Sequence, residues 1–124
     1  FLQRSLGEIP YLKGNPAGLE SAIINLLKNS IQAFSQSETK EKQIVINTYS
    51  KNHNIYIEVR DNAIGIDNKL LDRVYDPFFT TKEINEGMGL GLTMVHWVIS
   101  LHNGEIEINN NSQGGLTCKI KIPY

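Results

Sequence analysis

Apolar side chains recur at three- and four-residue steps between residues 17 and 35, which is the period of an amphipathic α-helix. Asn15 and Pro16 stand directly before this segment, and they are typical of the N-cap and of the first helical position. The same period returns in residues 92–102, which Asn103-Gly104 follows as a left-handed C-cap pair. The pattern therefore predicts two helices. The predicted inward positions of the second helix are Leu92, Val95, Val98, Ile99 and Leu101.

Alternation of apolar and polar positions predicts two β-hairpins. The first pairs residues 43–50 with 54–61, and the second pairs 105–109 with 116–123. A short edge strand is predicted at Ile9–Leu12, because Pro10 restricts a strand to an edge, and a short amphipathic helix at Ile66–Tyr75. The sum predicts the α+β class, as a two-layer α/β sandwich with helices on one face of a mixed, mostly antiparallel sheet.

Composition limits the classes of protein that fit this pattern. A chain of 124 residues is long enough for one domain with its own core, so residues 1–124 are taken as a single domain. A net charge of -1 argues against non-specific binding to nucleic acid or to an anionic membrane. The single cysteine, Cys118, permits no internal disulfide and is expected in the core. Because the chain begins with Phe1, we expect a fragment of a longer protein.

A glycine-rich stretch before the second helix is the first candidate for chemistry. Gly87, Gly89 and Gly91 carry no Cβ, so successive backbone N–H groups could surround an anion. The helix N-terminus behind them adds unpaired donors and partial positive charge. Gly-X-Gly also marks ordinary turns, so this pattern alone leaves a phosphate site and a plain turn open. Lys82 lies just upstream, either as a phosphate contact or as a solvated lysine.

Two further patterns have both a functional and a structural interpretation. Asn25, Asn29 and Gln32 form a polar stripe beside the apolar face of the first helix, either as a source of Mg²⁺ ligands or as a solvated edge. Asp61 falls in phase with the core at the end of a strand, so its carboxylate needs donors. An adenine amino group or a local turn bond to Asn62-Ala63 would supply one. His96 is expected on the surface, and His102 in a capping or packing role rather than in catalysis.

Four motifs in a fixed order resemble those of the catalytic ATP-binding domain of sensor histidine kinases. Asn25–Ser30 resembles the N box, and Asp61–Ile66 resembles the first glycine box. Asp76–Lys82 resembles the F box, and Gly87–Leu92 the second glycine box. The resemblance extends over Gly14–Tyr124, and it includes the wider superfamily of DNA gyrase, heat-shock chaperone and mismatch-repair ATPases. It implies a Bergerat-type ATP-binding fold.

The resemblance also implies residue roles. Asn29 would bind the Mg²⁺ that bridges the ATP phosphates, with Asn25 beside it on the same helix face. Asp61 would accept the proton of the adenine amino group, with Gly65 and Ile66 under the ring.

The phosphate end of the implied site lies in the second glycine box and the loop before it. Lys82 and residues 83–86 would form a short lid, with Lys82 in contact with phosphate, and Gly87, Gly89 and Gly91 would hold the phosphates. The resemblance assigns four more residues to the nucleotide site: Ala33, Met88, Leu90 and Leu92.

Two positions depart from the family pattern, and a third separates the kinases from the hydrolysing ATPases. Ala63 stands where the first glycine box usually has glycine, and Cys118 where the last box has an aromatic residue. Asn25 stands where the hydrolysing relatives carry a glutamate that activates water. An amide cannot act as a general base, so we expect ATP to be held without efficient hydrolysis, and no residue of this chain to act as acid or base.

The resemblance therefore implies a protein-histidine kinase domain of a two-component system, the C-terminal part of a longer kinase. It would donate the γ-phosphoryl group of ATP·Mg²⁺ to a histidine on a separate dimerisation domain, for relay to a response-regulator aspartate. We expect a monomeric, cytoplasmic fragment without nucleic-acid or membrane contact, within a dimeric full-length kinase for which the sequence leaves membrane anchoring open. The first alternative is a degenerate nucleotide-binding module, which Ala63 supports. Two others are an anti-sigma type serine kinase and a gyrase-type ATPase, and Asn25 is evidence against both.

Overall fold

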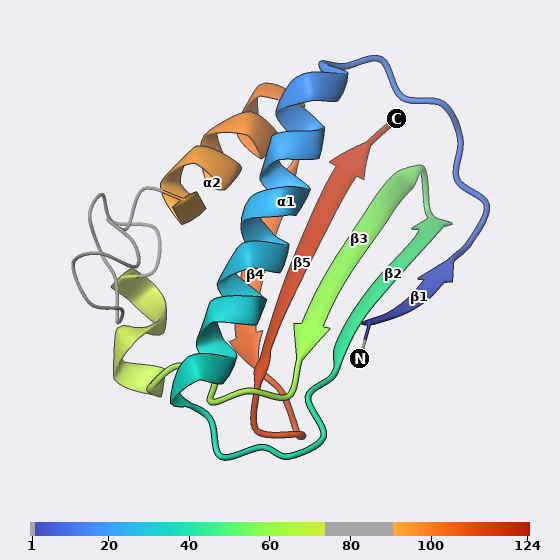
Figure 1. Ribbon diagram of the computed structural model, residues 1–124. Helices are drawn as coiled ribbons and strands as arrows, with labels where there is room; N and C mark the ends of the chain where they lie inside the picture. The colour runs from blue at the N-terminus through green and yellow to red at the C-terminus, as the bar shows by residue number, and fades with distance from the viewer. Residues whose placement is uncertain (1, 74–90) are drawn as a thin grey trace.

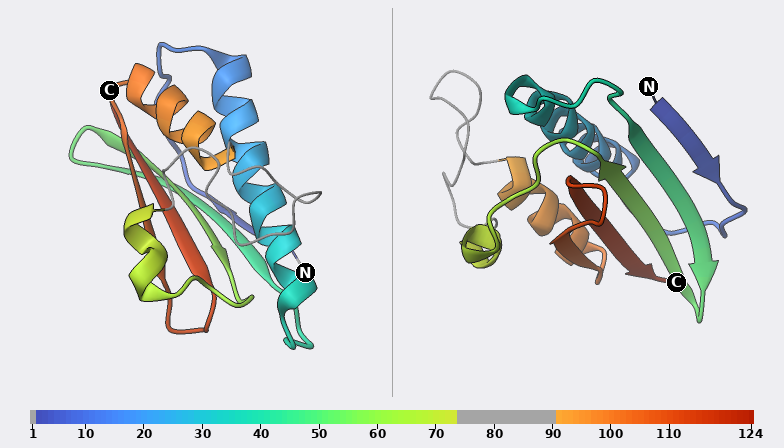
Figure 2. Two further views of the ribbon diagram at one scale, coloured as in Figure 1. Left: turned by 90° about the vertical axis from the view of Figure 1, so that its left-hand side faces the viewer. Right: turned by 90° about the horizontal axis from the view of Figure 1, so that it is seen from below.

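The computed structural model describes residues 2–73 and 91–124, which form a mixed five-stranded sheet with two α-helices on one face (Figures 1 and 2). The strand order is β1-β2-β3-β5-β4. The elements are β1 (Leu2–Leu6), α1 (Pro16–Ala33), the 3₁₀ turn η1 (Phe34–Gln36), β2 (Ile44–Lys51), β3 (Asn54–Asp61), the 3₁₀ helix η2 (Asn68–Arg73), α2 (Gly91–Leu101), β4 (Glu105–Asn110) and β5 (Leu116–Pro123). This arrangement confirms the predicted two-layer sandwich and its class.

The two predicted hairpins are both present. β2 and β3 pair antiparallel from Ile44 opposite Asp61 to Lys51 opposite Asn54. The turn between them has positive φ at Asn52 and His53, which matches the right-handed twist of the two strands. β5 pairs antiparallel with β3 on one side and with β4 on the other. Only β1 runs parallel to its neighbour, β2, so the sheet is mixed and mostly antiparallel, as predicted.

The core lies between the sheet and the two helices, which run side by side over it (Figure 1). Both helices contribute their predicted apolar faces, and β3 and β5 contribute alternate side chains. α1 begins as predicted, because the Asn15 side chain accepts a hydrogen bond from Gly18 N at 3.1 Å and Pro16 occupies the first turn. The buried residues of the core are Ala22, Leu26, Phe34, Ile44, Val59, Ala63, Val95, Ile99, Ile108, Cys118, Ile120 and Ile122.

The first strand was predicted in the wrong place. Residues 9–12 form no strand, whereas Leu2–Leu6 does, in parallel register with Ile44–Thr48. Gly7 N donates to Thr48 O at 2.9 Å and ends this pairing. The chain must then cross from β1 to the start of α1 before β2 returns beside β1, and residues 9–12 belong to that crossing.

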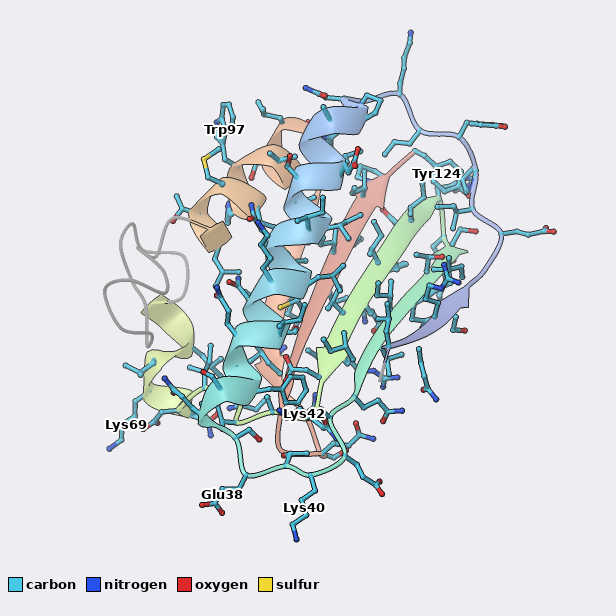
Figure 3. The ribbon with its side chains drawn as sticks, viewed as in Figure 1. Glu38, Lys40, Lys42, Lys69, Trp97 and Tyr124 are labelled. Carbon is cyan, nitrogen blue, oxygen red and sulfur yellow. The ribbon has the colours of Figure 1, made fainter. Side chains whose placement is uncertain are left out.

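Two details of the helices also differ from the prediction. Within the segment predicted as an amphipathic helix, Ile66–Tyr75, the structure has the 3₁₀ helix η2 over Asn68–Arg73, while Val74 and Tyr75 lie outside the described residues. Leu101 was predicted to face inward but is 63% exposed, and Trp97 is 58% exposed and points away from α1 (Figure 3). Both lie on the side of α2 opposite Val95 and Ile99, because buried positions on a helix return at three- and four-residue steps.

Candidate nucleotide-binding site

Three of the predicted site residues lie along one line of α1. Asn25, Asn29 and Ala33 follow one another at four-residue steps, so each is one turn from the next on the same face. All three are half-buried, at the border between the core face and solvent. The segment that follows β3 passes the C-terminal half of α1 on its way to η2 (Figures 1 and 2). The structure therefore brings the polar stripe of α1 and the end of β3 to the same end of the molecule.

Asp61 is the buried carboxylate of this region. It is 4% exposed, and it is the last residue of β3, on the face that the helices cover. Its Oδ1 accepts hydrogen bonds from Ala63 N and from Leu116 N, each at 3.1 Å. The first is the local turn bond that the sequence left open as an alternative, and the second comes from β5, 55 residues away. A buried carboxylate requires such donors, and both described bonds fall on one of its two oxygens.

The segment after Asp61 forms the tight turn that the first glycine box predicts. Ala63 is buried in the core, and Gly65 has a φ of 68°, a conformation that favours glycine. A Cβ at Gly65 would also lie 2.5 Å from Asn110 Oδ1 and 3.1 Å from Gly114 O. Both reasons require glycine at this position, so Gly65 marks a close approach of the β4–β5 loop. Ala63, at the position where the family pattern has glycine, fits the turn without strain.

The family description "Histidine kinase-, DNA gyrase B-, and HSP90-like ATPase" matches residues 14–124. The chain belongs to this ATPase family. Binding of ATP is the property that the family assigns to the domain.

Named relatives of this ATPase-family domain are kinases of bacterial signalling. Sporulation kinase A of Bacillus subtilis (strain 168) is 34% identical over 113 residues, which cover 91% of this chain and 18% of that protein. Sporulation kinase B of the same strain is 34% identical over 110 residues, covering 89% and 24%. The chain thus spans about a fifth of the length of these curated relatives.

A solved structure has the same fold. The mycobacterial sensor histidine kinase MprB superposes with a TM-score of 0.82 over 98% of this chain and 83% of that one, at 21% identity. Because the identity is low, this likeness establishes the fold of the ATPase-family domain and nothing further.

The second glycine box of this ATPase-family domain is described only at its end. α2 begins at Gly91, the last of the three glycines and one residue before the predicted start of the helix. A Cβ at Gly91 would meet no heavy atom of the described residues within 4 Å, and Leu92 packs against the core. Five predicted contacts lie outside the described residues, and so do residues 83–86 of the predicted lid: the five are Lys82, Gly87, Met88, Gly89 and Leu90.

Cys118 is a core residue, as predicted, and lies on β5 opposite Val59. Burial, together with the smaller effect of the nearby negative charge of Asp61, raises the pKa of its thiol to about 12. A thiol with this pKa stays protonated at neutral pH, so it is neither a nucleophile nor a metal ligand there.

The asparagines of the β4–β5 loop were missed from the sequence. Asn110 and Asn111 hydrogen-bond to the two ends of the Asp61–Ile66 segment. The available signal was the run of three asparagines before Gly114-Gly115, which is rich in turn-forming residues. Nothing local in the sequence shows which segment such a loop contacts.

Residues 2–73 and 91–124 contain no group of three or more His, Cys, Asp or Glu side chains that could hold a metal ion. In the same ranges, no helix has the length and apolar character that crossing a bilayer requires.

Proposed function

We propose that this chain is the catalytic ATP-binding domain of a two-component sensor histidine kinase. It binds ATP·Mg²⁺ and donates the γ-phosphoryl group to a histidine on the dimerisation domain of the same kinase. A response-regulator receiver domain then accepts the phosphoryl group on an aspartate. Membership of the ATPase family and the named kinase relatives support this function. The single observation that carries it is the buried carboxylate of Asp61 at the end of β3.

Asp61 is the residue we assign to adenine recognition. Its two described hydrogen bonds hold Oδ1 in place, so we assign Oδ2 to the amino group of adenine. A hydrogen bond from that amino group to a carboxylate is charge-assisted, and it is stronger because the site is shielded from water. Gly65 and Ile66 continue the same segment, and we place the purine ring against them.

The polar stripe of α1 is the part we assign to the metal ion and the phosphates. Mg²⁺ prefers oxygen ligands and keeps several of its waters, and the amide oxygen of Asn29 is a ligand of this kind. When bound, Mg²⁺ neutralises phosphate charge during transfer. Asn25 lies one turn earlier on the same face and carries no group that takes a proton near neutral pH. The domain therefore holds ATP in position for an external nucleophile and does not activate water.

We assign the remaining contacts to residues of the F box and the second glycine box. Lys82 contacts phosphate as a point charge, and Gly87, Gly89 and Gly91 hold the phosphates with their backbone N–H groups. Ala33, Met88, Leu90 and Leu92 line the nucleotide. We place residues 1–124 as one monomeric domain in the C-terminal part of a dimeric cytoplasmic or membrane-anchored kinase.

The test is calorimetric titration with a non-hydrolysable ATP analogue, with and without Mg²⁺. Asp61→Asn keeps an oxygen acceptor for Ala63 N and Leu116 N but replaces the charged oxygen that faces adenine, so affinity should fall by about 10- to 100-fold. Asn29→Ala should remove only the Mg²⁺-dependent part of the affinity. Asp67→Asn is the matched control, because Asp67 is exposed and, within the part of the chain that the structure describes, its carboxylate accepts a hydrogen bond only from the neighbouring Lys69 N, at 3.0 Å.

Two outcomes would refute the proposal. One is a wild-type domain that binds no nucleotide at millimolar concentration, and the other is equal affinity of wild type and Asp61→Asn. Transfer itself is tested by adding the purified dimerisation domain and measuring acid-labile phosphohistidine. A domain that binds ATP but forms no phosphohistidine would be a nucleotide-binding module without transfer.

A further inference from the structure

Three consecutive asparagines, Asn109, Asn110 and Asn111, lead from β4 into the β4–β5 loop. Asn109 is exposed on the outer face of the sheet, on the same side as Glu107, and the described residues provide no hydrogen bond to its side chain. The side chains of Asn110 and Asn111 instead cross to the Asp61–Ile66 segment. Three identical residues in a row thus have two different environments.

The Asn111 side chain makes four hydrogen bonds, of which one reaches Asp61, one reaches Thr117 of β5 and two lie within the loop. Its Nδ2 donates to Asp61 O at 3.0 Å and to Thr117 Oγ1 at 3.3 Å. Its Oδ1 accepts from Gln113 N at 3.0 Å and from Gly115 N at 3.2 Å. One side chain therefore fixes the shape of the loop and its position against the backbone of Asp61.

The loop that Asn111 shapes also supplies a donor to the Asp61 carboxylate. Leu116 N donates to Asp61 Oδ1, and Gly115, just before it, is in such close contact with Asp61 that a Cβ there would overlap the carbonyl group of Asp61. The rotation of the carboxylate depends on where Leu116 N lies. Asn111 therefore influences the direction in which Asp61 Oδ2 points, because it fixes the loop that places Leu116 N.

Asn110 holds the other end of the same segment. Its Oδ1 accepts from Ile66 N at 2.8 Å, and its Nδ2 donates to Ile66 O and to Asn68 Oδ1, the latter at 3.0 Å. The Asn110 amide thus bonds to both the N–H and the C=O of one residue, as the backbone of a neighbouring strand would do. Both ends of the Asp61–Ile66 segment are therefore fixed by adjacent residues of one loop.

We infer that Asn111, with Asn110, is a positioning residue that sets the preference of this site for adenine over a 6-oxopurine. The inference rests on the proposed function, in which Asp61 Oδ2 meets position 6 of the purine. There an amino group donates a hydrogen bond to the carboxylate, whereas an oxo group presents a second acceptor and is repelled. This difference is large only if Oδ2 keeps its direction, because a carboxylate that can rotate turns away from the oxo group.

The experiment compares dissociation constants for ATP and inosine triphosphate, which carries a 6-oxo group, on wild type and five variants. Asn111→Ala should reduce the ATP-over-inosine-triphosphate preference at least about fivefold, by loss of hydrogen bonds that fix the loop. Asn110→Ala should reduce it in the same direction. Asn109→Ala is the matched control and should keep the wild-type preference. Asn111→Asp keeps acceptors for Gln113 N and Gly115 N but cannot donate to Asp61 O, so it should also lose preference. Asp61→Asn should abolish it.

A purely structural role for Asn111 would lower both affinities equally and leave their ratio unchanged. The inference is overturned if Asn111→Ala keeps the wild-type ratio of the two dissociation constants. If the alanine variant does not fold, the same result in Asn111→Asp overturns it. The proposed function would still stand in either case if Asp61→Asn loses the preference for ATP. If wild type itself shows no preference for ATP, the assignment of Asp61 to adenine fails first, and the inference fails with it.

Discussion

The substitution Gly115→Ala tests most directly how the β4–β5 loop packs against the site. A Cβ built on Gly115 would lie 2.5 Å from Asp61 Oδ1 and 2.6 Å from the Asp61 carbonyl carbon, and it would overlap the carbonyl oxygen. Cβ atoms in proteins essentially never approach within 3.0 Å. Because two of these three atoms belong to the backbone of β3, no side-chain rotation relieves the overlap. Gly115→Ala must therefore push the loop away from β3.

The magnitude follows from what this displacement breaks. Inserting a methyl group into a packed site costs about 1–3 kcal/mol. Moving the loop also weakens the bonds from Leu116 N to Asp61 and from Gly115 N to Asn111, at about 1 kcal/mol each. The free energy of unfolding should thus fall by about 3–5 kcal/mol, out of about 5–15 kcal/mol for a domain. With a slope of about 1.5 kcal/mol per molar urea, the unfolding midpoint should drop by about 2–3 M.

Gly114→Ala is the matched control for this experiment. Gly114 has a φ of 90°, so alanine there is strained by about 1–2 kcal/mol, but its nearest atom is Ala63 O at 3.9 Å. Urea unfolding followed by circular dichroism should therefore rank Gly115→Ala well below Gly114→Ala in stability. Equal losses for the two variants would refute the contact between the loop and Asp61.

Two further predictions concern side chains away from the nucleotide. The His102 Nδ1–H bonds to Val98 O at 2.8 Å, and its Nε2 accepts from Asn15 N at 2.9 Å, so His102→Ala should lower the free energy of unfolding by about 1–2 kcal/mol. The exposed His96→Ala should change it by less than about 0.5 kcal/mol in urea unfolding, and equal effects would contradict a link between α1 and α2. Cys118 should not react with a thiol reagent at pH 8 until the domain unfolds, because its pKa is raised to about 12. Between about pH 9 and 12 the unfolded state releases the thiol proton and the folded state keeps it, so stability should fall by up to about 1.4 kcal/mol per pH unit. Cys118→Ala should lose this part of the slope, and an identical slope in the variant would contradict the buried thiol.

Patterns of apolar and polar residues predicted the elements whose contacts lie close together in the sequence. The hairpin of β2 and β3 follows from period-two alternation around a short turn, and α1 from a broad apolar stripe with Asn15 as its cap. The burial of Asp61 was predictable for the same reason, since it falls in phase with Ile55 and Val59 on one face of β3. The roles of Asn25, Asn29 and Lys82 remain predictions.

Contacts between distant segments could not be read in the same way. β1 pairs in parallel with a strand that follows α1, and nothing within Leu2–Leu6 specifies that partner. The strand was predicted instead around the proline at position 10, because proline in a strand is typical of an edge. The donor to Asp61 from Leu116 N is a backbone group, which no side-chain pattern marks. The contact of Asn111 with Asp61 spans 50 residues and depends on the loop conformation.

The parallel pairing of β1 has a consequence for the order in which the domain gains and loses structure. Leu2 pairs with Ile44, 42 residues later, whereas β2 and β3 close over a turn of two residues. Closing the longer loop costs more chain entropy, and all five residues of β1 are exposed, so little apolar burial offsets that cost. β1 therefore forms after the rest of the sheet and separates from it first. The domain behaves as a cooperative four-stranded unit with an attached strand of lower local stability, and amide exchange along Leu2–Leu6 should be faster than along β3.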